Sequence, residues 1–419
     1  MRILFISQYF YPEQFSNNEI ASWLVKQGHE VDVVCAVPNY PEGVFSEGHS
    51  NTERREECWN GVRIHRAWTR PRGKSAWTLL QNFLTYPVAA IHTMRRHVGG
   101  RADVSFVSMP SPLTQALAGI YQKHRHKTPL VYWVQDIWPE SLLLTLNIRN
   151  RFVVWVLMAF CGWIYRRADL IMVQSSAFPP MIERFGIDPE VIRVLPNTAP
   201  GTYFPMAADP ESTIGRMMPN EGFRLMFAGN IGESQDFDTY LDAASILEVK
   251  GYNVAWLIVG SGRDLSRVES EVARRGLMSR FHFLGRHPEP DMPEFFSHAD
   301  AMLVGLKDTP IFGMTVPYKV QCYMACGKPI VGSLSGEGAR IIAQSGAGIC
   351  APAQSPEALV SAITQMVDAS PQTRQRMAQA GRDFFEKTYA ADKVYDNLQT
   401  WLQDMTQTQQ SQEKTTLKE

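Results

Sequence analysis

The sequence predicts an α/β protein of two Rossmann-like, doubly wound parallel-sheet domains with a ligand cleft between them. Its 419 residues exceed the roughly 250–300 at which single hydrophobic cores divide into domains. Short β-branched runs alternate with segments of helical periodicity, as in parallel sheets wound with helices. Residues 198–222 have the composition of a linker, with small and polar residues around Pro200, Pro205, Pro210 and Pro219.

Strand-like runs fall into two groups on either side of this linker. The first group is RILFIS, EVDVVCAV, VRIHRAW, VSFVSM, LVYWVQD and LIMVQS, and the second is RLMFAGN, AWLIVG, FHFLG, AMLVGL and PIVGS. Ligands bind where the carboxyl ends of such strands meet, so function is expected there. We expect domains at 1–200 and 201–388, a C-terminal helix over 389–405 that packs back on the first domain, and a disordered tail over 406–419.

Composition narrows the class of protein. Lys and Arg number 41 against 42 Asp and Glu, so the total charge does not call for a nucleic-acid partner. The six cysteines form no CxxC pair, which favours buried thiols in a reducing compartment over disulfides or zinc. The N-terminus reads as a first strand without a signal-peptide cleavage site. The apolar run at 152–165 is shorter than the roughly 20 residues that a spanning helix needs.

A glycine-punctuated turn follows the first strand of the second group. Gly229, Asn230 and Gly232 lie between that strand and a helix, where backbone amides can hold a diphosphate. The alternative is a tight turn without a ligand. The next turns along the chain supply further candidates for a nucleotide, namely Gly262 with Arg263, and Phe283, Leu284 and Arg286, although both phenylalanines of FHFLG also fit a core.

The segment PIFGMTVPYKVQCYMACGKPIVG is the most informative in the chain. Pro317 fits the first turn of a helix, and Gly327 with Pro329 fits its end. Lys319 would then lie beside free helix amides, where a cation can neutralise a departing diphosphate. The alternative is an ordinary solvated lysine.

Two further motifs that contain carboxylates are candidates for a functional role. Asp136 ends the strand of LVYWVQD, where catalytic side chains of wound folds gather, so it is a candidate to orient or deprotonate an acceptor hydroxyl. Its alternative role is the N-cap of the helix that begins near Pro139. Asp236 and Asp238 resemble a metal-binding DxD pair, but the first turn of a helix explains them better, and no metal site is expected.

Two apolar segments with basic ends are typical of a lipid-facing surface. Residues 77–96 end in two arginines, and Arg149, Arg151, Arg166 and Arg167 bracket the apolar run at 152–165. This pattern fits helices that lie at the headgroup level of an anionic membrane. Internal packing is the alternative.

In combination these motifs resemble family 4 of the retaining glycosyltransferases, which have the GT-B architecture of two Rossmann-like domains. The likeness is nearest to bacterial O-antigen and exopolysaccharide transferases for fucosamine-type sugars. It covers nearly the whole chain, through ILFISQYFYPE, GHEV, VQDIWPESL, ADLIMVQSS, VLPNT, FAGNIG, IVGSGR, FLGR and TVPYKVQCYMACGKPIV.

The resemblance implies roles for residues at matching positions. The N-terminal domain would bind the acceptor, and its first loop would face donor and acceptor through Glu13, Ser16, Asn17 and Asn18. The C-terminal domain would bind the nucleotide sugar through the Gly229 turn, the end of the Phe283 strand, and Thr315, Val316, Tyr318, Lys319 and Gln321. Asp136 and Lys319 would be the catalytic residues.

The sequence departs from the family at several positions. Met314 and Cys322 stand where relatives carry two glutamates, and Asn230 and Gln235 lie near the turn where relatives carry Arg and Lys. These departures shift the expected positive charge to Lys319 and Arg263.

The resemblance implies a retaining transferase that moves an N-acetylated 6-deoxyhexosamine, such as N-acetylfucosamine, from a UDP-sugar without a required cofactor. The implied acceptor is a polyprenyl-diphosphate-linked saccharide at the inner face of the bacterial cell membrane, with the enzyme cytoplasmic and peripheral. The alternatives are a catalytically inactive partner subunit, suggested by the missing glutamates, and a nucleotide-sugar 2-epimerase.

Overall fold

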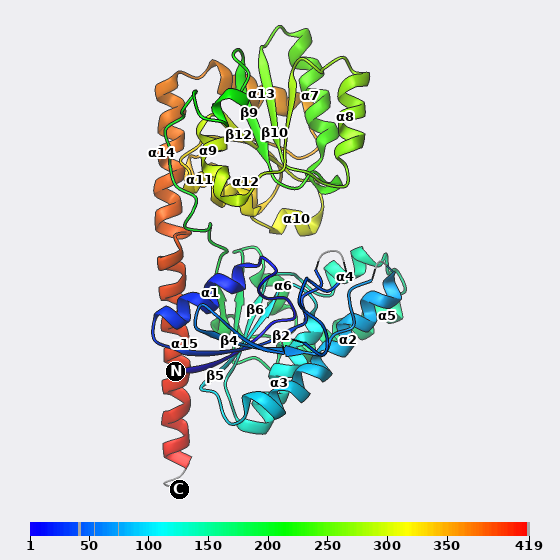
Figure 1. Ribbon diagram of the computed structural model, residues 1–419, viewed down its shortest axis with the longest axis vertical. Coiled ribbons are helices and arrows are strands. Elements are labelled where there is room, and N and C mark those ends of the chain that lie inside the picture. Colours follow the sequence, from blue (N-terminus) through cyan, green and yellow to red (C-terminus); the bar gives the residue numbers. More distant parts are fainter. Residues whose placement is uncertain (41–42, 54, 74, 417–419) are drawn as a thin grey trace. The chain divides into compact units, whose positions relative to one another are not determined.

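A computed structural model describes residues 1–416 apart from 41, 42, 54 and 74. The chain forms two compact units, each built around one sheet (Figure 1). Unit 1 comprises Met1–Pro196 and Tyr395–Glu419, and unit 2 comprises Asn197–Val394. The predicted domain boundary, at residue 200, lies slightly later in the chain than this division.

Unit 1 is an eight-stranded sheet in the order β3-β4-β2-β1-β5-β6-β7-β8. All neighbours pair in parallel except β3 and β4. The central strands are almost continuously apolar, which suits a sheet covered on both faces. The strands are β1 Arg2–Ile6, β2 Glu30–Ala36, β3 Glu56–Trp59, β4 Val62–Ala67, β5 Val104–Met109, β6 Leu130–Val134, β7 Leu170–Val173 and β8 Ile192–Val194; the α-helices are α1 Ser16–Lys26, α2 Ala76–Thr93, α3 Ala116–His126, α4 Glu140–Thr145, α5 Arg151–Tyr165 and α6 Pro179–Glu183.

Unit 2 is a six-stranded, wholly parallel sheet in the order β11-β10-β9-β12-β13-β14. Together with unit 1 it confirms the predicted fold class of two doubly wound α/β domains. The strands are β9 Phe223–Ala228, β10 Val254–Val259, β11 Phe281–Gly285, β12 Ala301–Gly305, β13 Ile330–Ser333 and β14 Gly348–Ala351; the α-helices are α7 Phe237–Val249, α8 Leu265–Arg274, α9 Met292–Ser297, α10 Pro310–Met314, α11 Tyr318–Ala325, α12 Glu337–Ser345, α13 Pro356–Asp368 and α14 Pro371–Thr388.

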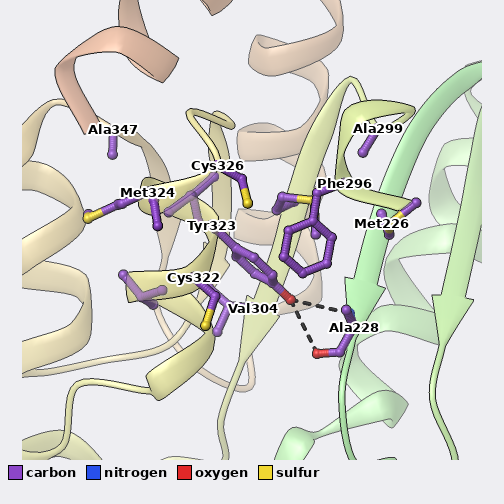
Figure 2. Packing of buried hydrophobic residues seen from close by; sticks show 14 of the residues in the cluster. Met226, Ala228, Phe296, Ala299, Val304, Cys322, Tyr323, Met324, Cys326 and Ala347 are labelled. Atoms are coloured by element: carbon purple, nitrogen blue, oxygen red, sulfur yellow. Dashed lines mark hydrogen bonds between the residues drawn. The ribbon is translucent and has the colours of Figure 1, made fainter. Parts of the chain in front are cut away.

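A buried tyrosine fastens α11 to the end of β9. The Tyr323 hydroxyl accepts a hydrogen bond from the Ala228 amide at 3.2 Å and lies 3.4 Å from the carbonyl oxygen of the same residue (Figure 2). The ring packs edge-on against Phe296, with centroids 5.2 Å apart. Because Ala228 immediately precedes the glycine turn, this contact sets the position of α11 relative to that turn.

The last helix, α15 Ala391–Thr416, packs on unit 1 through its described side chains. Tyr395 contacts Trp23, with centroids 5.5 Å apart, and its hydroxyl donates to Glu19 at 3.3 Å. The helix continues through most of the segment predicted to be disordered, because that segment is rich in Gln, Glu and Lys, which favour helix, and contains neither Gly nor Pro. The end of the predicted tail, 417–419, lies outside the described residues.

Replacing Tyr323 by Phe tests this anchor. The substitution leaves the buried Ala228 amide without its partner, so we expect the free energy of unfolding to fall by about 1–3 kcal/mol. Tyr252→Phe is the matched control, because the Tyr252 hydroxyl donates to Asp368 at an exposed site, and it should change stability by less than about 0.5 kcal/mol. Urea unfolding monitored by tryptophan fluorescence measures both, and equal effects would contradict the anchoring role.

Candidate functional site

The turn after β9 and the turn after β10 lie backbone against backbone. The Gly229 amide donates to Val259 O at 2.9 Å, and the Ile231 amide donates to Ser261 O at 2.8 Å. A Cβ at Gly260 would lie 1.9 Å from Gly229 O, which no side chain tolerates. Glycine is therefore required here for close approach of the two turns, and φ of +131° at Gly229 favours glycine at that position as well.

Lys319 in the first turn of α11 reaches this glycine turn. Its Nζ donates to Gln235 Oε1 at 2.6 Å and lies 3.9 Å from the centroid of the Phe227 ring. A Cβ built on Gly229 would lie 3.4 Å from Nζ. The predicted neighbourhood of lysine, helix start and glycine turn is thus present within unit 2.

The Lys319 ammonium forms no ion pair with a carboxylate among the described residues. Loss of hydration lowers the pKa of Lys319 to about 7. A cation held in this way, with a ring face and one amide oxygen as neighbours, is available to an incoming anion.

A cavity of about 430 Å³ opens beside the lysine. Five predicted donor residues line it, namely Gly229, Asn230, Thr315, Tyr318 and Lys319. The other lining residues were not predicted as donor contacts, and many of them are apolar: Tyr203, Ala228, Ser234, Gln235, Met292, Phe296, Leu306, Phe312, Pro317, Cys322 and Tyr323. Four of them, Tyr203, Met292, Phe296 and Leu306, come from other segments of unit 2, and the sequence offers no local signal for that contact.

Other predicted donor residues do not line this cavity. Gly232 and Gly262 lie in the two joined turns, and a Cβ at Gly262 would lie 2.0 Å from Ile231 O, so Gly262 allows the close approach of the Gly229 turn. Arg263 and Arg286 are exposed away from the cavity lining. Val316 and Gln321 are buried in the protein interior, so direct contact between their side chains and a ligand in this cavity is not supported.

The end of β11 is also occupied by internal contacts. The side chains of Phe283 and Leu284 pack against different hydrophobic clusters, as alternation along a strand requires. The Leu284 carbonyl oxygen lies 2.8 Å from His287 Nε2. The predicted main-chain contact with a base at Leu284 therefore competes with an existing partner.

Asp136 follows β6 in unit 1. Burial raises the pKa of its carboxyl group to about 6, and the hydroxyl of Ser141, which donates to Oδ1, opposes this shift. The N-cap of α4 is Pro139, so the alternative assignment of Asp136 as that N-cap is wrong. A carboxyl group with a pKa near neutrality at a strand's carboxyl end is suited to proton transfer or to orienting a hydroxyl.

The first-loop candidates hold the loop itself. Oε1 of Glu13 accepts the amides of Asn39 and Tyr40, each at 2.7 Å, and burial raises the pKa of Glu13 to about 7. The Asn17 amide group donates to Ser7 and Tyr9, and that of Asn18 donates to Glu13 O at 2.7 Å. These three side chains position the loop, and Ser16 is the half-buried first residue of α1.

The Asp236 and Asp238 pair is engaged within unit 2. Asp236 is the N-cap residue of α7 and accepts the Thr239 hydroxyl at 2.5 Å, whereas Asp238 pairs with Arg267 at 2.6 Å. Among the described residues no group of His, Cys, Asp or Glu has the arrangement of a metal site.

Comparison with known families matches both units. Residues 16–198 match the model of the glycosyl transferase 4-like domain, and residues 217–384 match that of glycosyl transferases group 1. The chain is a glycosyltransferase. Its two α/β domains have the GT-B fold, and its type is that of family 4.

Relatives and solved structures agree with this assignment. The glycosyltransferase is 23% identical over 359 residues, 83% of its chain and 86% of the other, to the Escherichia coli K12 protein named "Putative colanic acid biosynthesis glycosyl transferase WcaI". Sucrose-phosphate synthase from Thermosynechococcus elongatus superposes with a TM-score of 0.74 at 14% identity, covering 96% of this chain and 98% of that one. Anabaena HepE, solved with UDP and with UDP-glucose, gives TM-scores of 0.70 and 0.69 at 15% and 16% identity, covering 96% of this chain and 100% of HepE.

Replacing Lys319 by Met tests the state of this cation. The pKa of Lys319 is lower in the folded state, so the unfolded chain binds the proton more tightly. The charged lysine therefore destabilises the fold below pH 7. This destabilisation decreases as pH rises toward the pKa of the unfolded state. We expect the variant to raise the Tm of the ligand-free enzyme by a few degrees at pH 6 and by less at pH 9. A Tm difference that grows with pH would contradict this, and Lys250→Met, at an exposed lysine, should show no such trend.

Proposed function

We propose that the enzyme is a retaining transferase that moves a sugar from a UDP-sugar to a lipid-linked glycan during synthesis of a surface polysaccharide. The observation that carries the proposal is the Lys319 ammonium beside the Gly229 turn, without a carboxylate partner among the described residues. A diphosphate that enters the cavity would find this cation in surroundings of low polarity, where electrostatic stabilisation is strong.

The donor nucleotide is proposed to be UDP. Structures of Anabaena HepE with UDP and with UDP-glucose support this choice. The diphosphate would lie against the turn at Gly229, with Lys319 on its oxygens and Gln235 holding the lysine in place. Because Lys319 supplies the positive charge, we propose that transfer needs no metal cofactor.

The donor sugar is proposed to be an N-acetylated 6-deoxyhexosamine such as N-acetylfucosamine. Apolar side chains of Met292, Phe296 and Phe312 line the cavity and suit the methyl groups at C6 and on the acetyl group. Cys322 also lines it, at one of the positions where relatives carry a glutamate. A sugar with fewer hydroxyl groups requires fewer polar partners than glucose would.

The acceptor is proposed to be a polyprenyl-diphosphate-linked saccharide. The name of the E. coli relative, which refers to colanic acid biosynthesis, supports a role in surface polysaccharide synthesis. Asp136 would accept a hydrogen bond from the acceptor hydroxyl and orient it.

Transfer is proposed to retain the anomeric configuration. The bond from the anomeric carbon to the diphosphate breaks, and the acceptor oxygen attacks the same face through an oxocarbenium-like state. The acceptor proton passes to the diphosphate oxygen that leaves, which balances the step. Stabilisation of the leaving group by Lys319 would dominate catalysis.

Donor binding and turnover test the role of Lys319. We expect UDP to raise the Tm of the enzyme more than GDP or dTDP does, and Lys319→Ala to lower turnover at saturating donor by about 10²–10³, the loss typical of removing one charge-stabilising donor. Lys319→Arg should retain more activity than Lys319→Ala. Full turnover by Lys319→Ala would remove this assignment, whereas an isomerised donor without transfer would support the epimerase alternative. Turnover that EDTA abolishes would contradict the metal-free step.

The pH profile tests Asp136 separately. Because its pKa is raised to about 6 and the ionised form accepts the hydrogen bond, turnover should fall as pH drops through about 6. Asp136→Asn should be slow at every pH and should lack this fall in turnover, which is the acidic limb of the pH profile. Ser141→Ala removes the donor that stabilises the carboxylate, so the limb should move to higher pH. An unshifted limb in Ser141→Ala would contradict the assignment of the limb to Asp136.

A further inference from the structure

Two helices of unit 1 expose apolar stripes to solvent. In α2 the exposed side chains are Trp77, Leu80, Leu84 and Val88, spaced by three or four residues so that they share a face. In α5 they are Phe152, Val153, Trp155, Val156 and Trp163, and Phe152 and Trp155 are 70% and 65% exposed. Internal packing, the alternative that the sequence left open, does not hold for these side chains.

The first two-thirds of α5 is unusual for a helix of a soluble domain. Its residues from 151 to 160 are nearly all apolar, yet none of them is buried. A helix that is apolar all round is normally covered by protein or lipid. Exposed aromatic side chains at this density therefore indicate a surface that another body covers.

The charges around both stripes have one sign. Residues 58–102 and 141–168 contain no Asp or Glu. Arg95 and Arg96 follow α2, Arg149 and Arg151 lie at the start of α5, and Arg166 and Arg167 lie at its end. Within the described part of the chain none of these six arginines forms an ion pair with a carboxylate.

Arg149 and Arg151 lie at the positive end of the α5 dipole, and the first turn of the helix contains no acidic residue. Cations are unfavourable at that end of a helix, whereas anions are favourable. An anionic surface against the arginines would relieve this repulsion. The body that covers the stripes is thus expected to carry negative charge.

Both helices flank the loop that carries Asp136. Phe83 of α2 contacts Trp138 in this loop, with centroids 6.1 Å apart, and α4, which follows it, lies with α2 and α5 in the same part of unit 1 (Figure 1). In the described part of the chain no helix is both long and apolar enough to span a bilayer. These helices suit the interface plane of a membrane instead.

We infer that the α2 and α5 stripes form a docking surface for an anionic lipid bilayer, which brings the Asp136 loop to lipid-linked acceptors. The inference rests on the proposed function for the nature of the acceptor. Phe152, Trp155 and Trp77 enter the boundary between headgroups and acyl chains, and the flanking arginines contact lipid phosphates.

Vesicle sedimentation tests the surface without reference to turnover. The full-length enzyme should bind vesicles of equal parts phosphatidylcholine and phosphatidylglycerol, and bind vesicles of phosphatidylcholine alone more weakly. Phe152→Ser with Trp155→Ser should lower partitioning at least about tenfold, because two aromatic side chains no longer leave water. Arg149→Gln with Arg151→Gln should lower binding to the anionic vesicles and reduce its dependence on salt.

Val249→Ser is the matched control, because Val249 is 89% exposed on α7 of unit 2, and it should bind vesicles like the wild type. The folded state of each variant is verified by an unchanged Tm shift with UDP. The inference would be overturned if the wild-type enzyme did not bind the anionic vesicles, or if the aromatic variant, Phe152→Ser with Trp155→Ser, bound them equally well. A dimer in sedimentation velocity that the aromatic variant dissociates, without vesicle binding, would assign the surface to a second copy.

Transfer to a water-soluble saccharide without the polyprenyl chain separates this inference from the proposed function. The aromatic variant should transfer to that acceptor at the wild-type rate and lose activity only on acceptor embedded in vesicles. Absence of transfer by the wild type to either acceptor, with vesicle binding intact, would remove the proposed function and leave the membrane surface in place.

Discussion

The proposed donor site depends on the Lys319 cation, which has no carboxylate partner among the described residues. Lys319 lies between the Gln235 amide oxygen and the Phe227 ring, next to a glycine turn that a second glycine turn supports from behind. Hydration or a neighbouring carboxylate ordinarily stabilises the charged form of a lysine. Here loss of hydration lowers the pKa of Lys319 to about 7. In the proposed function this charge is unfavourable until the diphosphate binds, a trade of stability for function that is common at active sites.

The two units place different ionisable groups in different surroundings. Unit 2 combines its cation with an apolar cavity, whereas unit 1 carries a buried carboxyl group of raised pKa at Asp136 and an apolar, arginine-flanked surface on α2 and α5. In each unit the polar group lies near the carboxyl ends of parallel strands, where strand ends leave side chains and amides free for ligands. The basic flanks of α2 and α5 do not show in the nearly neutral total charge of the chain, because residues 58–102 and 141–168 contain no Asp or Glu and the acidic residues lie elsewhere.

Much of the fold was predictable because apolar β-branched runs mark parallel strands buried on both faces. The short strands β3, β8 and β14 were missed, although Asn60-Gly61, both at positive φ, is a strong local sign of the β3–β4 hairpin. Lys319 and Gly229 were predictable from helix-start and turn signals. Gln235 was missed as a partner because it lies 84 residues from Lys319 along the chain, and only packing brings them together. For Glu13, which stays a predicted ligand-facing residue, the burial and the two backbone amides that it accepts leave no local trace in the sequence.

The central claim is that Lys319 receives the diphosphate as a cation. Titration calorimetry with UDP at pH 8, repeated in buffers of different ionisation enthalpy, measures the protons that accompany binding. A diphosphate that raises the lysine pKa from about 7 requires uptake of up to about one proton per UDP bound. We predict such uptake in the wild-type enzyme and none in Lys319→Met. Tight UDP binding without proton uptake, or equal uptake in both proteins, would contradict the account.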